Sequence, residues 1–229
     1  MRVSRETRSR PPVGVPVSQE PLARFLALIA AAPQRLVAST KPADLQAHVD
    51  DALGSLPLLV AEAGPLIDVG SGAGFPGIPL LLARPDWTGT LLDSRAKRCG
   101  HLEEAVAVAG LAERVTVLNL RAEEHAAGAG RDHYGIAVAR ALAPPPVALE
   151  LCLPLVRPGG VCLLHAGEVD RRTLERVAAE LGAEVELIEP VPGFDARQRV
   201  LVRKQTATPA GYPRRVGQAA KEPLVRGGD

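Results

Sequence analysis

The chain has 229 residues, of which 46% are hydrophobic, and its mean hydropathy of +0.07 is ordinary for a soluble globular protein. No apolar run approaches the roughly 20 residues that a membrane span needs, and the basic N-terminus is not followed by the apolar core of a signal peptide. The three cysteines, Cys99, Cys152 and Cys162, lack the spacing of metal ligands, so we expect a cytoplasmic protein without a metal site.

Charge is unevenly distributed although the net value is only +1. Residues 11–195 contain 15 Lys and Arg against 23 Asp and Glu, whereas residues 1–10 and 196–229 together hold 12 basic residues against 3 acidic ones. Basic ends on an acidic body suggest that the ends contact nucleic acid. A basic tail can also be a merely solubilising segment, and charge alone does not decide between the two.

The first quarter of the chain predicts a disordered segment and a small helical cap. Residues 1–17 are rich in Arg and Pro without periodicity, which is typical of disorder. Residues 18–62 predict two amphipathic helices, the first broken by Pro33 and the second beginning after Pro42 and running to Leu56, where Pro57 disturbs its end.

His48 and Asp51 are three residues apart in the second of these helices, so they should be neighbours on its surface. They can face an active-site cleft or form a simple surface pair. The sequence leaves both interpretations open.

The most informative stretch is 66–79, which reads Leu-Ile-Asp-Val-Gly-Ser-Gly-Ala-Gly-Phe-Pro-Gly-Ile-Pro. Its apolar start predicts a buried strand, and its glycines predict a sharp turn where a ligand can lie close to the backbone. Pro76 falls where a helix can begin. Strand, glycine turn and helix form the opening unit of a Rossmann-like α/β domain, with a ligand at the helix N-terminus.

Two carboxylates indicate which ligand this turn binds, since the pattern G-x-G-x-x-G alone is also a weak dinucleotide signal. Asp68 stands where dinucleotide folds usually carry an apolar residue, and it can meet the methionyl amine of S-adenosylmethionine or simply hold the loop. Asp93 ends the next predicted strand, where it can accept both ribose hydroxyls or cap the strand. Together they predict a nucleoside site and favour S-adenosylmethionine over NAD.

The rest of the chain alternates strands and helices, which predicts a mainly parallel sheet with helices on both faces. We expect strands at 66–69, 89–93, 115–118, 136–139, 161–165, 183–188 and 198–204, and helices at 76–84, 95–109, 146–156 and 168–181. The last two strands are joined too briefly for a crossover helix, so strand 198–204 should be antiparallel to its neighbour. This domain should span 63–205, followed by a basic C-terminal tail at 206–229.

In such a sheet, ligands bind at the carboxyl ends of the strands. Four polar residues stand at predicted strand ends, namely Asp68, Asp93, Glu123 and Arg140. We therefore expect them to surround the ligand.

Several motifs, in this order, resemble the small-subunit ribosomal RNA guanine-N7 methyltransferases, also called glucose-inhibited division protein B. The matching segments are 67–79, 84–85, 91–94 with 97–98, 121–124, 140–141, 158–160 and 212–215 with 221–224. The resemblance covers about residues 20–224. A glycine turn extended by Phe-Pro-Gly-Ile-Pro is far more specific than a generic glycine loop.

This resemblance implies a Rossmann-like class I methyltransferase that uses S-adenosylmethionine and methylates N7 of a guanine in bacterial 16S ribosomal RNA. The expected cofactor contacts are Asp68, Gly70, Gly72, Phe75, Asp93, Ala122, Glu123 and Arg140. Because N7 carries a lone pair and no proton, no catalytic base is needed, and Arg140 is only a candidate for positioning. We expect a monomer. A non-catalytic RNA-binding assembly factor and an NAD-dependent oxidoreductase remain the alternatives.

The chain departs from the family pattern on the side expected to face RNA. It has Arg35-Leu36-Val37 where many members have Asn-Leu-Thr, Ala52 where they have Ser, and His165-Ala166-Gly167 where they often have Lys-Gly. These departures leave the identity of the methylated nucleotide open.

Overall fold

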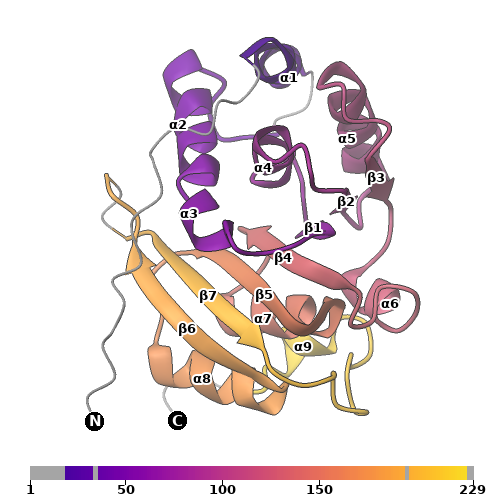
Figure 1. Ribbon diagram of the computed structural model, residues 1–229, viewed down its shortest axis with the longest axis vertical. Coiled ribbons are helices and arrows are strands. Elements are labelled where there is room, and N and C mark those ends of the chain that lie inside the picture. The colour runs from indigo at the N-terminus through magenta and orange to yellow at the C-terminus, as the bar shows by residue number, and fades with distance from the viewer. Residues whose placement is uncertain (1–18, 33–35, 194–195, 226–229) are drawn as a thin grey trace, which may run out of the picture.

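The computed structural model describes residues 19–32, 36–193 and 196–225, so the segment 1–17, expected to be disordered, lies outside the described residues. Within them the chain forms a seven-stranded sheet with helices packed on both faces (Figure 1). No helix in this part of the chain is long and apolar enough to cross a membrane.

The strand order across the sheet is β3-β2-β1-β4-β5-β7-β6. The strands are β1 (Leu66–Val69), β2 (Gly89–Leu92), β3 (Val115–Leu118), β4 (Tyr134–Arg140), β5 (Val156–Ala166), β6 (Ala183–Pro190) and β7 (Gln198–Lys204). Neighbours from β3 to β5 pair in parallel, and β7 is antiparallel to both β5 and β6. The predicted mostly parallel sheet with an antiparallel last strand is therefore confirmed.

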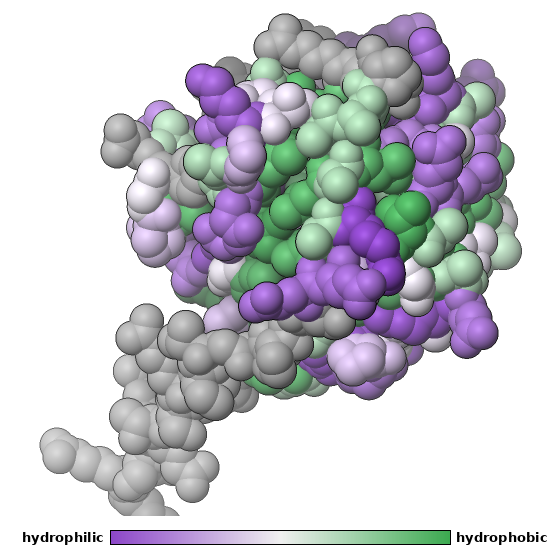
Figure 2. Space-filling view, turned by 90° about the horizontal axis from the view of Figure 1, so that it is seen from above, coloured by the Kyte–Doolittle hydropathy of each residue, from purple (hydrophilic) through white to green (hydrophobic). Residues whose placement is uncertain are grey.

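The alternation of side chains along the strands divides the core into two layers. In β1, Leu66 belongs to one layer, and Ile67 and Val69 belong to the other. The first layer is covered by α1 (Gln19–Ala31), α2 (Pro42–Leu53), α3 (Leu56–Leu59), α4 (Gly77–Ala83) and α5 (Ala96–Val108). The second is covered by α6 (Ala122–Ala126), α7 (Pro145–Cys152) and α8 (Arg171–Glu180). Seen from above, apolar side chains occupy the middle of the helical face, between hydrophilic ones (Figure 2).

The helix expected from Pro42 to Leu56 is divided in two. Helix α2 ends at Leu53, Gly54 follows as its C-cap, and α3 begins at Leu56 with Pro57 in its first turn. A proline is tolerated there because the first N–H groups of a helix have no intrahelical partner. Pro57 therefore helps to start a short helix and does not end a long one.

Strand β5 starts five residues earlier than the expected strand 161–165. Val156 pairs with Tyr134, and the register then shifts where Gly159 takes a φ of +83°. The glycine turn at 158–160 is thus a bulge inside the strand. The sequence also gave no sign of α6 and α9 (Gln218–Lys221), because helices of five and four residues are too short to show periodicity.

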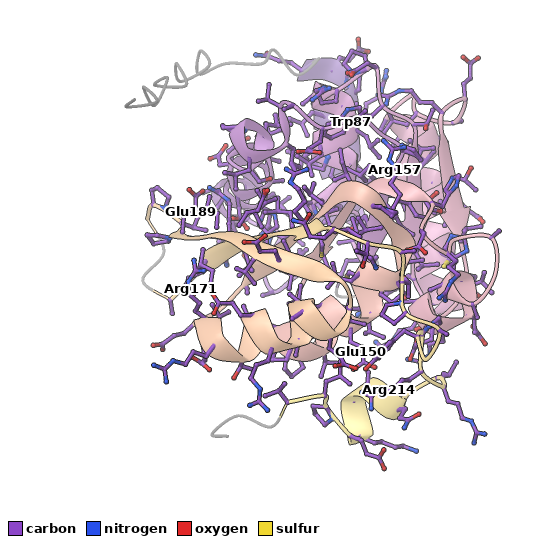
Figure 3. The ribbon with its side chains drawn as sticks, turned by 60° about the horizontal axis from the view of Figure 1, so that its bottom comes forward. Trp87, Glu150, Arg157, Arg171, Glu189 and Arg214 are labelled. Atoms are coloured by element: carbon purple, nitrogen blue, oxygen red, sulfur yellow. The ribbon has the colours of Figure 1, made fainter. Side chains whose placement is uncertain are left out.

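The described part of the basic tail, residues 206–225, is folded against the domain. Tyr212 and Val225 pack on the second core layer, and Arg131 donates to the carbonyl oxygen of Tyr212. Arg214 forms a two-pronged ion pair with Glu150 of α7, with Nε–Oε1 at 2.5 Å and Nη2–Oε2 at 2.6 Å. Figure 3 shows these two side chains facing one another. Arg214 is therefore engaged in holding the segment in place.

The beginning of this segment is held by a buried lysine. The side chain of Lys204 is fully buried, and its Nζ donates to the carbonyl of Leu153 at 2.9 Å and to the hydroxyl of Thr208 at 2.7 Å. Asp132 accepts from the hydroxyl of Thr208 at 2.6 Å and lies 3.7 Å from Nζ. Burial lowers the pKa of Lys204 to about 8, and Asp132 opposes that shift.

We predict that Arg214→Ala lowers the free energy of unfolding by about 3 kcal/mol, because it leaves the buried carboxylate of Glu150 without its cation. Chemical denaturation measures this change. Arg215→Ala removes a neighbouring charge that is exposed, so it should change stability by less than about 0.5 kcal/mol. Equal effects of the two substitutions would show that the ion pair does not hold the segment.

Candidate functional site

The glycine turn after β1 is anchored by the buried carboxylate of Asp68. Its Oδ2 accepts from the hydroxyl of Ser71 at 2.8 Å and from the backbone N–H of Gly77 at 3.0 Å. A Cβ at Gly77 would lie 2.6 Å from the same oxygen, so only glycine allows helix α4 to start this close to the strand. Asp68 therefore holds both ends of the turn, as the loop-holding interpretation proposed. Its direct contact with a cofactor stays a prediction.

The second oxygen of this carboxylate is unusual. Asp68 Oδ1 is buried and has no hydrogen-bond partner among the described residues. Burial raises the pKa of Asp68 to about 6, although the hydrogen bonds from Ser71 and Gly77 lower it. A buried acceptor without a partner is costly, and it suits a site that receives a cationic or hydrogen-bond-donating ligand.

Asp93, directly after β2, ties the turn to the neighbouring strand. Its Oδ2 accepts from the N–H of Gly72 at 3.1 Å, and its Oδ1 accepts from the N–H of Arg95 at 2.9 Å. Arg98 Nη1 lies 3.3 Å from Oδ2. Gly72, Arg95 and Arg98 occupy three of the about four acceptor positions of this carboxylate, so one ribose hydroxyl can bind directly and a second one binds if the cofactor displaces Arg98. The geometry is compatible with the predicted role at the ribose.

A cavity of about 310 Å³ opens beside these residues, and we call it the first cavity. Its lining includes Gly70, Asp93, Ala122, Glu123, Leu142 and Leu151. Gly70 has a φ of +72°, and a Cβ there would come within 2.6 Å of Leu142 Cδ1. The volume is at the lower end of the range of about 300–1,000 Å³ that small-molecule sites occupy. Four of the predicted cofactor contacts thus line the same cavity.

Glu123 connects this cavity to the C-terminal segment. Its Oε1 accepts from the backbone N–H of Gly217 at 2.8 Å. Ala122 and Glu123 stand in the first turn of α6, which Glu124 caps by accepting from the N–H of Arg121. Glu123 was expected at the end of a strand but lies in α6, after β3 has ended at Leu118, and its contact with a residue 94 positions away could not be foreseen.

Phe75 and Arg140 meet on the other side of the turn. The Phe75 ring is buried, with centroids 5.1 Å from Phe25 and 5.3 Å from His48. Arg140 Cζ lies 5.2 Å from the Phe75 ring, and its Nη1 is 3.3 Å from His48 Nδ1. The Phe75 side chain is thus part of the core layer, and its contact with the cofactor stays a prediction.

Asp51 of α2 joins several basic side chains that are distant in sequence. Its carboxylate lies 3.0 Å from Arg197, 3.4 Å from Arg140 and 3.4 Å from His165 Nδ1, and it lies 3.9 Å from Arg199. Burial alone would raise the pKa of Asp51, but the hydrogen bond from His165 and the positive arginines lower it to about 2. Asp51 is therefore buried and ionised, so the surface-pair interpretation of His48 and Asp51 is wrong.

A second cavity of about 580 Å³ lies beside this cluster. Its lining includes Val37, His48, Arg140, Ala141, His165 and Arg197. The two cavities share Ala141, which has a φ of +53° although it is not a glycine. Such strained residues gather at functional sites. The first cavity therefore adjoins a second, arginine-lined cavity immediately after β4.

Comparison with known proteins identifies the family. A family model described as rRNA small subunit methyltransferase G matches residues 18–202. The chain belongs to this family. It is 42% identical over 171 residues to ribosomal RNA small subunit methyltransferase G of Roseiflexus castenholzii, covering 70% of each chain. It is 38% identical over 223 residues to the Deinococcus radiodurans protein of the same name, covering 90% of this chain and 85% of the relative.

Solved structures show the same fold at low sequence identity. A ribosomal protein L11 methylase from Lactobacillus delbrueckii matches with a TM-score of 0.54 at 16% identity, over 69% of this chain and 79% of that one. An O-methyltransferase from neocarzinostatin biosynthesis, solved with S-adenosylmethionine, matches with a TM-score of 0.51 at 21% identity, over 82% and 67%. The predicted family and its Rossmann-like methyltransferase fold are confirmed, and neither alternative function is favoured.

We predict that Gly72→Val abolishes S-adenosylmethionine binding in a calorimetric titration, because a side chain on this turn would occupy space beside the methionyl group. In the chain itself a Cβ at Gly72 meets nothing closer than 3.7 Å, so the loss would not come from a clash within the protein. Gly110→Val is the matched control, since Gly110 has a similar φ of +67° and open space around it. Normal cofactor binding by Gly72→Val would refute the placement of the turn.

We predict that Asp93→Ala raises the dissociation constants of S-adenosylmethionine and S-adenosylhomocysteine by roughly 10- to 100-fold, the cost of losing charged hydrogen bonds of about 1.5–3 kcal/mol. Affinity for RNA should change little. Asp86→Ala removes an exposed carboxylate that pairs with Arg84, and it should leave both constants unchanged. Unchanged affinity of Asp93→Ala would reduce Asp93 to a strand cap.

Proposed function

We propose that this protein transfers the methyl group of S-adenosylmethionine to N7 of a guanine in 16S ribosomal RNA, acting as a monomer in the cytoplasm. The reaction class follows from the family, whose members are named small-subunit ribosomal RNA methyltransferases. The finer assignment rests on one observation, the meeting of the two cavities at Ala141. A methyl donor in the first and a nucleotide in the second would be neighbours there.

The first cavity suits the adenosine part of the cofactor. Asp93 would accept the ribose hydroxyls, and the Glu123 carboxylate would accept from the exocyclic amine of adenine. Leu142 and Leu151 provide apolar walls for the base. The methionyl part would follow the glycine turn, near Asp68. When bound, the cofactor supplies an electrophilic methyl group on a cationic sulfur.

Methylation at N7 asks little of the protein beyond positioning. The N7 lone pair attacks the methyl carbon, the carbon–sulfur bond breaks, and no proton moves in that step. The protein must hold the two atoms about 3–3.5 Å apart and in line, and exclude water. Arg140 is suited to positioning, because it lines the second cavity next to Ala141 and its guanidinium is fixed by His48, Asp51 and the Phe75 ring.

The surroundings of the site are suited to a polyanion. Arg95, Arg98 and Arg121 line the first cavity, and Arg140 and Arg197 line the second. The C-terminal segment offers the exposed cations Arg215 and Lys221, whereas Arg214 pairs with Glu150. The idea that the basic end contacts RNA therefore rests on Arg215 and Lys221.

We predict that the double change Arg215→Ala and Lys221→Ala weakens RNA binding and flattens its log–log salt dependence by about 0.7–0.9 for each lost phosphate contact. Cofactor affinity should stay the same. The control is Arg171→Ala with Arg172→Ala, which removes two charges from α8 on the far side of the sheet from the cap (Figure 3). A salt slope that falls equally in both variants would mean that net charge alone matters.

The function is tested by mapping N7-methylguanosine in 16S ribosomal RNA from cells with and without this protein, using borohydride reduction and aniline cleavage. We expect one modified guanosine to disappear without the protein and to be restored by purified protein with S-adenosylmethionine. If the modification pattern is unchanged while the protein binds the RNA, a non-catalytic assembly role would replace this proposal.

A further inference from the structure

One residue that lines the second cavity, His165, carries a polar atom that neither the cofactor site nor the arginine cluster uses. The side chain of His165, at the end of β5, is fully buried, and its Nε2 has no hydrogen-bond partner among the described residues. Leaving a buried polar atom unpaired destabilises the folded protein. Because His165 is one of the residues that line the second cavity, a ligand bound there is the candidate that supplies the missing partner.

The hydrogen-bond role of this atom is fixed from the other side of the ring. His165 Nδ1 lies 3.4 Å from Asp51 Oδ1, and Asp51 is ionised. Only a protonated Nδ1 can donate to that carboxylate. Burial and the charges of Arg140 and Arg199 lower the pKa of His165, which keeps the ring neutral. Its Nε2 is then an acceptor, and its missing partner must be a donor.

The position of His165 in the sheet suits one edge of guanine. β4 lies between β1, which leads into the glycine turn, and β5, and Arg140 pairs with His165 in register. Neighbouring strands are about 4.8 Å apart, so His165 lies roughly 10 Å from the end of β1. Guanine carries N7 on one edge and its 2-amino group on the opposite one. A guanine whose N7 points toward the glycine turn would direct its N1–H and 2-amino donors toward β5.

We propose that the second cavity holds the target guanine and that His165 Nε2 accepts a hydrogen bond from its N1–H or 2-amino group, which makes His165 the residue that selects guanine. This inference rests on the proposed function. Adenine presents no donor at these two positions, so it would leave Nε2 buried and unpaired. Asp51 acts through His165 as the positioning residue that keeps the acceptor side of the ring toward the base.

The test uses the 16S RNA with the mapped guanosine replaced by inosine, which lacks the 2-amino group, or by 2-aminopurine, which lacks N1–H. Both analogues retain N7. Single-turnover methyl transfer is measured at saturating S-adenosylmethionine for the wild type, His165→Asn and His165→Gln. The Asn amide can still donate to Asp51 but places no acceptor at the position of Nε2. The Gln side chain is long enough to place its oxygen there.

We expect the wild type to methylate one analogue roughly tenfold more slowly than guanosine, His165→Asn to lose this difference, and His165→Gln to keep part of it. His133→Ala, an exposed histidine far from Asp51 in the chain, should behave as the wild type. Cofactor affinity and the thermal transition are measured for each variant.

Two results would overturn this inference while leaving the proposed function intact. One is a wild type that methylates both analogues at the guanosine rate, a result that needs no variant to fold. The other is a His165→Asn enzyme with the same analogue penalties as the wild type. Failure to methylate guanosine at all would instead count against the proposed function.

Discussion

The site depends on two carboxylates that hold one glycine turn from neighbouring strands. Asp68 fixes the turn internally through Ser71 and Gly77, and Asp93 fixes it to β2 through the N–H of Gly72. Because the turn follows a fully buried strand, its position is set by the sheet and not by the ligand. A cofactor that arrives in this turn finds its backbone already ordered, so little entropy is lost on binding.

A second carboxylate hub attaches the helical cap to the sheet. Asp51 on α2 contacts side chains near the ends of β4, β5 and β7, while apolar residues of α1 and α2 pack on the first core layer. Three arginines around one buried carboxylate leave a surplus of positive charge that Glu189 only partly offsets. The cap therefore forms one wall of the second cavity and helps to give it a positive electrostatic potential. A positive potential suits a phosphate-bearing substrate.

The sequence predicted the elements whose signals are local. The apolar run Leu66–Val69 bounded by glycine gave β1 to the residue, and the short final connection gave the antiparallel β7. Contacts between distant residues had no such signal. Asp51 contacts Arg197, which is 146 positions away in the sequence, and Arg214 contacts Glu150, which is 64 positions away. The basic tail, whose sequence suggested an exposed segment, is therefore partly held against the domain by an ion pair. The helix predicted to run to Leu56 is interrupted at Gly54, and the strand predicted at 161–165 begins earlier, because Pro57 can start a helix and Gly159 can form a bulge.

The ligand of the glycine turn decides which chemistry this site performs, and calorimetric titration of the full-length protein with S-adenosylmethionine and with NAD identifies it most directly. We predict saturable binding of S-adenosylmethionine at one site per chain and no measurable binding of NAD at the same concentrations. Binding of NAD without S-adenosylmethionine would contradict the assignment of the first cavity, and with it the placement of the reacting methyl group beside Ala141.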